Sequence, residues 1–133
     1  MINKYFLEEP NILDLSKEIF NAVVDENLKI ENRFELISKK IEDAETVNFI
    51  LADGLGFSNL QSTDSFLNKH INNVVNTTFP SSTNVALTTI AMQANPIDHG
   101  VFSYYMYDKL KYGLINALNW NSENKNLLLS KYF

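Results

Sequence analysis

The sequence has 133 residues, 45% of them hydrophobic and 20% charged, a composition typical of one globular domain and not of a disordered chain. Cysteine is absent, which excludes disulfides, thiolate metal sites and a cysteine nucleophile, so Asp, Glu, His or hydroxyl groups would have to hold any metal. The 16 acidic residues outnumber the 11 basic ones, and the net charge of -5 argues against a nucleic-acid-binding groove.

The first residues and the apolar runs bear on localisation. Residues 1–10 include Glu8 and Glu9 and lack an apolar stretch preceded by basic residues, so they do not resemble a secretory signal. No apolar run approaches the roughly 20 residues of a membrane span. The sequence therefore predicts a cytoplasmic protein without membrane association.

Two amphipathic helices are expected first. From Asn11 to about Asp25, apolar residues recur every three or four positions, with Asn11 placed to cap the helix and Asp14 in its first turn. A second helix is predicted from Asn32 to Ala44. We assign both to packing, as a helical lead-in to a sheet.

A βαβ unit is expected next. Thr46 to Ala52 is β-branched, aromatic and almost continuously apolar, as in a strand buried on both faces of a parallel sheet. Leu60 to about His70 is predicted to be a helical crossover, and Ile71 to Phe79 a second strand. The fold class predicted is thus α/β, with a mainly parallel sheet flanked by helices.

The remaining elements are shorter. A helix is predicted to start at Ser82 or Thr83 and to run to about Gln93. Strands are expected at 101–107 and 114–120, with a turn at Gly113 and a loop over 121–126. The apolar end, Leu127 to Phe133, is either a helix docked on the core or a segment whose partner lies beyond Phe133.

Asp53 is the first candidate for chemistry. An acidic residue directly after a buried strand lies at the edge of the sheet where α/β proteins bind ligands, and its oxygens suit Mg2+ or Zn2+. Gly54 and Gly56 would allow close approach of a ligand. The alternative is that Asp53 only begins a turn, because Asp-Gly is a common turn pair.

Hydroxyl-rich residues Thr77 to Asn84 form the second candidate. They lie between a predicted strand and a predicted helix start, where backbone N–H groups favour a phosphate or a developing oxyanion. A Ser or Thr nucleophile needs a base or a metal, and with two histidines in the chain a metal is the expected activator. The alternative is a simple helix cap.

Farther along, His99 is expected to be a structural hydrogen-bonding residue.

Three motifs occur in a familiar order: ILADGLG at 50–56, TTFPSSTNVALTTIA at 77–91 and NPIDHGVFSYYMYD at 95–108. Together they resemble the type I phosphodiesterase/nucleotide pyrophosphatase branch of the alkaline phosphatase superfamily. The pattern there is a strand followed by Asp-Gly, a Phe-Pro-Ser-x-Thr segment opening a helix, and a Pro-x-x-His-Gly turn. The resemblance covers about Thr46 to Trp120.

The resemblance implies roles for individual residues. Asp53 would be a metal ligand, and Thr83 would be both a metal ligand and the nucleophile that forms a covalent phospho- or nucleotidyl-enzyme intermediate. Thr78, directly before Phe-Pro, is the alternative nucleophile. Asn84 would help to hold the phosphoryl oxygens, and His99 would belong to a structural turn.

The family uses two divalent metal ions, here expected to be Zn2+, with Mn2+ or Mg2+ as alternatives, and acts on a phosphodiester or nucleotide substrate. Its further Asp and His ligands come from downstream segments. The chain departs from the family at Met92-Gln93, where a small Thr-Gly-like pair is usual. We therefore expect one incomplete domain over 1–133, with lead-in 1–45, core 46–120 and a truncated segment 121–133.

Such an N-terminal fragment would be inactive or nearly so alone, and would pair with a missing C-terminal part or another chain. Two other hypotheses remain: a non-catalytic interaction module, and a nucleotide-binding fragment using Ser81 to Asn84 as a phosphate cradle. The DNA beyond Phe133 would discriminate among them, because Asp- and His-rich motifs there would favour the enzyme.

Overall fold

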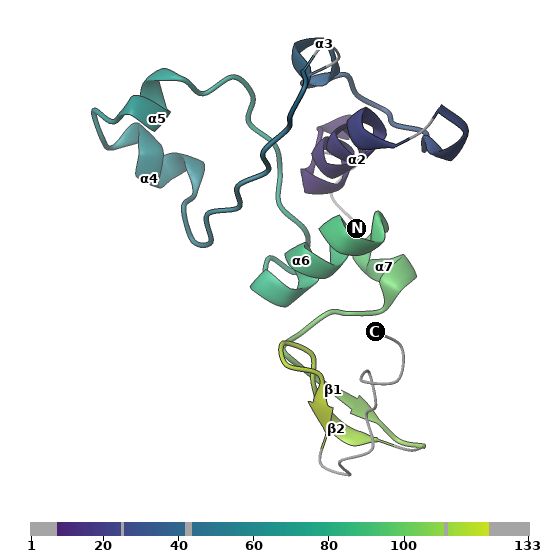
Figure 1. Ribbon diagram of the computed structural model, residues 1–133. Coiled ribbons are helices and arrows are strands. Elements are labelled where there is room, and N and C mark those ends of the chain that lie inside the picture. Colours follow the sequence, from purple (N-terminus) through teal and green to yellow (C-terminus); the bar gives the residue numbers. More distant parts are fainter. Residues whose placement is uncertain (1–7, 25, 42–43, 111, 123–133) are drawn as a thin grey trace. The chain divides into compact units, whose positions relative to one another are not determined.

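The computed structural model describes residues 8–24, 26–41, 44–110 and 112–122. The chain divides into two compact units, the first ending at Asn76 and the second beginning at Thr77 (Figure 1). This division falls inside the stretch 46–120 that the sequence predicts to be a single core. In the described part of the chain, none of the helices is both long and apolar enough to cross a membrane. The predicted C-terminal segment Leu127 to Phe133 lies outside the described residues.

The first helix of the first unit, α2 (Ile12–Val23), confirms the predicted amphipathic helix and its cap. Asn11 Oδ1 accepts the backbone N–H of Leu13 at 2.8 Å and that of Asp14 at 3.3 Å. The Asp14 carboxylate in turn accepts the N–H of Asn11 at 3.0 Å, which completes a capping box. Asn11 thus satisfies the N–H groups of Leu13 and Asp14, whereas the N–H of Ile12 donates to the Asn76 carbonyl at 2.8 Å.

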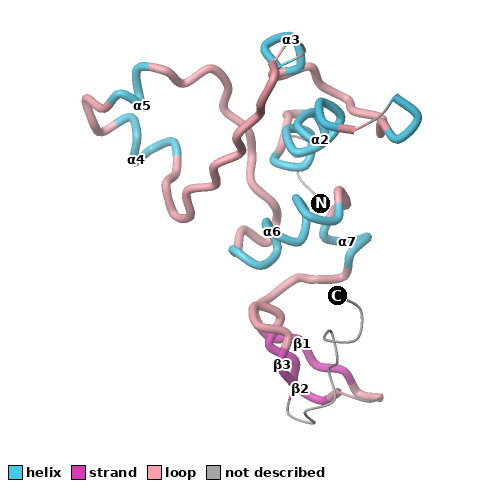
Figure 2. Tube along the Cα trace, viewed as in Figure 1, coloured by secondary structure: helices cyan, strands magenta, loops and turns pink. Residues whose placement is uncertain are grey.

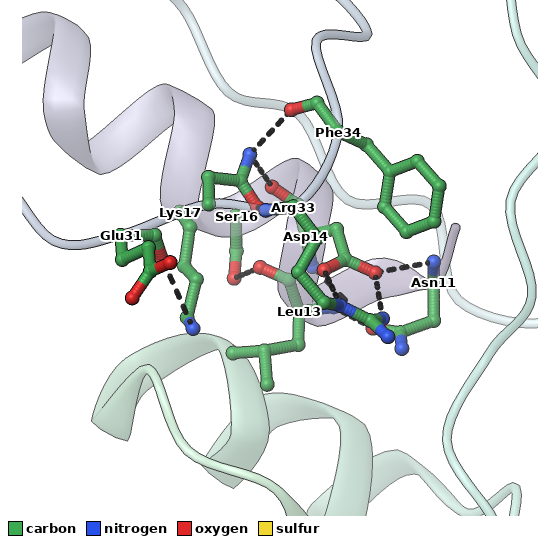
Figure 3. A network of polar contacts seen from close by, with 9 residues as sticks. Asn11, Leu13, Asp14, Ser16, Lys17, Glu31, Arg33 and Phe34 are labelled. Carbon is green, nitrogen blue, oxygen red and sulfur yellow. Dashed lines mark hydrogen bonds and ion pairs between the residues drawn. The ribbon is translucent and has the colours of Figure 1, made fainter. Parts of the chain in front are cut away.

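The polar side of α2 is buried against the chain that follows it (Figure 3). Arg33 donates two hydrogen bonds to the buried Asp14 carboxylate, from Nε to Oδ1 at 3.2 Å and from Nη2 to Oδ2 at 2.9 Å. Asn32 donates to the Asp14 carbonyl at 3.0 Å, and Lys17 Nζ donates to the Glu31 carbonyl at 3.3 Å. Polar contacts therefore hold residues 31–34 to the helix.

The second predicted helix, Asn32 to Ala44, is much shorter than expected. It consists of α3 (Ser38–Ile41), preceded by the 3-10 turn η1 (Glu26–Leu28). The cause is Glu18 of α2, whose carboxylate accepts the backbone N–H groups of residues 36–38. The Glu18 carboxylate thus satisfies the N–H groups of the two residues before α3 and of Ser38, its first residue, so the helix starts at Ser38 and not at Asn32.

The predicted parallel sheet, and with it the alkaline-phosphatase-like α/β sandwich, is wrong for the described residues. Strands are absent from 46–52 and from 71–79, where the one parallel pairing is an isolated bridge between Asn76 and Asn11. The apolar run Phe49 to Leu51 is exposed, and Ile50 reaches 86%. High β-propensity does not make a strand without neighbouring strands to pair with, and the rest of the described chain supplies none for this run. Between the two stretches, the predicted crossover is two short helices, α4 (Phe57–Gln61) and α5 (Phe66–Lys69).

The second unit combines two helices with an antiparallel sheet (Figure 2). The strands pair in the order β1-β2-β3, with Tyr105 opposite Asn116 and Ile115 opposite Ser122. A small core of Val85, Val101 and Ala117 lies at its centre. The elements are α6 (Thr83–Met92), α7 (Pro96–His99), β1 (Tyr105–Asp108), β2 (Gly113–Asn116) and β3 (Asn121–Ser122).

Sequence predictions hold better in this unit. The helix predicted from Ser82 or Thr83 is confirmed as α6. The strands predicted at 101–107 and 114–120 exist in part as β1 and β2, whereas β3 was expected to be loop.

The end of α6 leads to a stability prediction. Gln93, at the departure from the family pattern, has a left-handed backbone with φ of 52°. Glycine adopts this conformation without the strain that a side chain causes. We expect Gln93→Gly to stabilise the second unit by about 0.5 kcal/mol, a gain reduced by loss of the Gln93 Nε2 bond to the Ile90 carbonyl at 2.6 Å.

Urea unfolding followed by the fluorescence of Trp120, the single tryptophan, measures this effect. Gln93→Ala is the matched control, because it loses the same side-chain bond but keeps the strained backbone, and it should destabilise. Equal midpoints for the glycine and alanine variants would contradict the explanation.

Candidate functional site

The candidate nucleophile Thr83 is the first residue of α6 and is half-buried. The Tyr104 hydroxyl donates to Thr83 Oγ1 at 3.0 Å. Ser82 occupies the N-cap position, but its side chain does not cap the helix; its hydroxyl donates to Asn84 Oδ1 at 2.9 Å. The hydroxyl of Thr83 therefore lies at the positive end of a ten-residue helix, beside a second hydroxyl.

Asn84 is 3% exposed, and both ends of its amide are bonded within the protein. Its oxygen accepts from Ser82, and its Nδ2 donates to the Ser103 carbonyl at 2.6 Å. The side chain thus ties the start of α6 to the segment before β1. Its role in holding phosphoryl oxygens stays a prediction.

The alternative nucleophile, Thr78, occupies a different environment. Its side chain is buried, and its hydroxyl donates to the Pro80 carbonyl at 2.9 Å, next to the cis peptide between Phe79 and Pro80. The Thr78 hydroxyl is therefore used within its own turn, whereas Thr83 stands at a helix start beside Tyr104.

Asp53 lies in an exposed turn of the first unit, directly before Gly54, whose φ is +72°. The Leu55 N–H reaches the Ala52 carbonyl at 3.4 Å across this turn, as the simpler interpretation of Asp-Gly predicts. Thr83 belongs to the second unit, so the structure describes the two predicted metal ligands separately.

A divalent metal would need more ligands than these residues supply. No three Asp, Glu or His side chains gather within 8–24, 26–41, 44–110 and 112–122 in a way that could hold a metal ion. Asp53 and Thr83 offer oxygen donors of the right kind, but a zinc site takes roughly three or more protein ligands. These two residues by themselves do not fit the two-metal centre that the resemblance implies.

His99 has the structural role predicted for it. Its Nδ1 accepts the Val101 N–H at 3.1 Å, so the neutral ring carries its proton on Nε2, which lies 3.0 Å from the hydroxyl of the buried Thr89. Burial lowers the pKa of His99, and the neighbouring Asp98 carboxylate opposes part of that shift. Gly100, with φ of +74°, then ends α7.

The lowered pKa of His99 predicts a pH dependence. Because the unfolded chain binds this proton more tightly than the folded protein, protonation favours unfolding. The contribution of His99 to the free energy of unfolding is fully present above the ordinary histidine pKa of about 6.5. It declines as the pH falls from there toward the lowered pKa of His99 in the folded protein. Urea unfolding followed by Trp120 fluorescence between about pH 7 and pH 5, roughly where histidine changes charge, measures the slope of the free energy of unfolding against pH. The slope should shrink in His99→Gln, and an unchanged slope would contradict the assignment.

Tyr104 is the residue that sequence reasoning missed. It lies in the predicted strand 101–107, where an aromatic side chain is expected for packing reasons alone, and directly before β1. Its position a few residues after the Pro-x-x-His-Gly turn was the one available signal, and nothing in that spacing indicates contact with Thr83.

Comparison of the chain with protein families, curated proteins and solved structures produced no match.

Proposed function

We propose that this chain carries the nucleophile of a metal-dependent phosphodiesterase or nucleotide pyrophosphatase, and that Thr83 is that nucleophile. The observation that supports it most is the placement of the Thr83 hydroxyl at the start of α6, with the Tyr104 hydroxyl 3.0 Å away. Negative phosphoryl oxygens are favoured at such a helix start. The hydroxyl of Thr78, in contrast, is bonded within a buried turn.

The reaction would be an in-line displacement. A bond forms between Thr83 Oγ1 and phosphorus while the bond from phosphorus to the leaving oxygen breaks, and the hydroxyl proton passes to solvent. Water then cleaves the covalent Thr83 ester and frees the nucleophile. A bound divalent cation would supply the positive charge that makes a threonine hydroxyl nucleophilic near neutral pH.

Asp53 as a metal ligand and Zn2+ as the first candidate ion rest on the family resemblance alone. Residues other than Asp53 and Thr83 must complete the ligand set. We therefore expect turnover by this chain alone to be slight or absent, and a covalent product on Thr83 to be a more sensitive readout than turnover.

The experiment is to trap that covalent product. The chain is incubated with bis-p-nitrophenyl phosphate and Zn2+ or Mn2+, quenched in acid, digested and analysed by mass spectrometry. We expect a p-nitrophenylphosphoryl group on the peptide that contains Thr83, and its loss when a chelator removes the metal. Absence of any adduct at saturating metal and substrate would count against the proposal.

A second candidate function, an interaction module, is favoured by one observation. The apolar run Phe49 to Leu51 is exposed although its composition is that of a buried strand. An exposed run of this kind would also suit pairing within a larger enzyme, so the DNA that follows codon 133 is the deciding observation. Asp- and His-rich motifs there favour the enzyme, and a stop followed by unrelated sequence favours the module.

A further inference from the structure

We propose that Tyr104 is a positioning residue for Thr83, holding the Thr83 hydroxyl in one orientation and donating a hydrogen bond to Oγ1 as it attacks. The inference rests on the proposed function, because the orientation of Thr83 matters for chemistry only if Thr83 reacts. It starts from the 3.0 Å distance between the two hydroxyl oxygens, which belong to residues 21 positions apart.

The backbone of Tyr104 is fixed on both sides by contacts within the second unit. On one side, Asn84, the neighbour of Thr83 in α6, donates from Nδ2 to the Ser103 carbonyl at 2.6 Å. On the other, the Ala117 N–H donates to the Tyr104 carbonyl at 2.7 Å. Two hydrogen bonds, one from α6 and one from the residue after β2, therefore set the position of Tyr104.

A second set of contacts anchors the segment just before Tyr104. Val101 is buried in the core with Val85 of α6 and Ala117. Its N–H donates to His99, whose other ring nitrogen bonds Thr89 of α6. The segment that carries Tyr104 is thus attached to α6 at Asn84, Val85 and Thr89, and the phenol is presented to the first residue of the same helix.

The chemistry of the pair follows from its direction. Tyr104 donates and Thr83 Oγ1 accepts, so the hydroxyl proton of Thr83 must point away from the phenol. A hydrogen bond to an oxygen strengthens as negative charge gathers on it, which happens when Oγ1 loses its proton, before the new bond to phosphorus draws that charge away. The phenol would therefore favour the deprotonated form of Thr83 that attacks. A tyrosine suits this task because its side chain has only two rotatable bonds before the rigid ring, which fixes the position of the hydroxyl.

Side-chain rotamers test the positioning directly and without turnover. In the 13C,15N-labelled chain, three-bond couplings from the Thr83 methyl carbon to the backbone nitrogen and carbonyl carbon report its χ1 angle. We expect the wild-type couplings to indicate one rotamer and those of Tyr104→Phe to move toward rotamer-averaged values.

Two controls exclude a general loss of structure. Thr88, in the same helix, donates to the Asn84 carbonyl at 2.7 Å and should keep its couplings in Tyr104→Phe. Tyr107→Phe, at an exposed position of β1, should leave the Thr83 couplings unchanged. Unaltered Thr83 couplings in Tyr104→Phe would overturn the inference.

Adduct formation tests the hydrogen bond in the reaction. In the trapping experiment, Tyr104→Phe should form the Thr83 adduct about ten- to a hundredfold more slowly at saturating substrate, with the half-saturating substrate concentration unchanged. A fluorotyrosine at position 104, whose phenol is a stronger donor, should restore or exceed the wild-type rate below the pH at which that phenol ionises. A merely structural tyrosine would not make the rate follow donor strength, and a rate independent of the substituent would overturn the inference.

The two readouts separate this inference from the proposed function. If the wild-type chain forms no adduct while Tyr104→Phe releases the Thr83 rotamer, the proposed function fails and the positioning contact is supported. If the adduct forms, and Tyr104→Phe changes neither the Thr83 rotamer nor the rate of adduct formation, the proposed function is supported and the inference is overturned.

Discussion

Thr83→Ala is expected to lower the rate of adduct formation by about a thousandfold or more, because it removes the attacking oxygen itself. Alanine is a good helix former, and the hydrogen bond lost from Tyr104 is partly exposed, so the second unit should lose only about 1 kcal/mol of stability. Trapping followed by mass spectrometry measures the rate, and Trp120 fluorescence in urea confirms that the unit is folded.

The matched controls are two other threonines of the same unit. Thr78→Ala removes the alternative nucleophile and costs the hydrogen bond to Pro80, yet it should leave the adduct on Thr83. Thr88→Val, in the middle of α6, should also leave the adduct intact. An adduct that survives Thr83→Ala at wild-type rate, or that lies on Thr78, would refute the assignment.

Glu18→Ala is expected to produce the largest loss of stability in the first unit, about 3 kcal/mol. Glu18 is 5% exposed, and its carboxylate accepts the N–H groups of Leu36, Ile37 at 2.6 Å and Ser38 at 3.1 Å. Hydrogen bonds to a charged acceptor are stronger than neutral ones, and alanine would leave three donors without it. Helix α3, whose start depends on these bonds, should fray.

Urea unfolding followed by circular dichroism measures the free energy, and amide hydrogen exchange at residues 36–38 locates the effect. Glu35→Ala is the matched control, because Glu35 is exposed and its 3.7 Å ion pair with Lys39 should contribute no more than about 0.5 kcal/mol. A Glu18→Ala variant as stable as Glu35→Ala, with unchanged exchange at 36–38, would contradict the role given to this carboxylate.

Local features were predictable because their partners lie nearby in the sequence. Asn11 and Asp14 cap α2 from within three positions, as their residue types indicate. The start of α6 follows from the Pro-Ser-Ser-Thr stretch, and the turn that ends at Gly100 needs a left-handed residue that glycine supplies.

Long-range features were not predictable in the same way. The run Thr46 to Ala52 has the composition of a buried strand, but pairing depends on strands elsewhere in the chain, and the structure leaves the run exposed. In the sequence, Glu18 resembles an ordinary polar helix residue; only the structure shows that it accepts N–H groups 18 to 20 positions later. Likewise, Tyr104 resembles an aromatic residue of a strand, and only the structure shows its hydrogen bond to Thr83.

By itself, the sequence determined the cap of α2, the start of α6 and the candidate residues Asp53, Thr83 and Asn84. The tertiary structure alone decided that the sheet is antiparallel, that Thr78 is used within its turn and that Tyr104 stands beside Thr83. The physical reason is the distance along the sequence between the residues that interact. A cap or a turn is satisfied within about four residues. A strand pairing or a contact between hydroxyls depends on which distant segments the fold brings together.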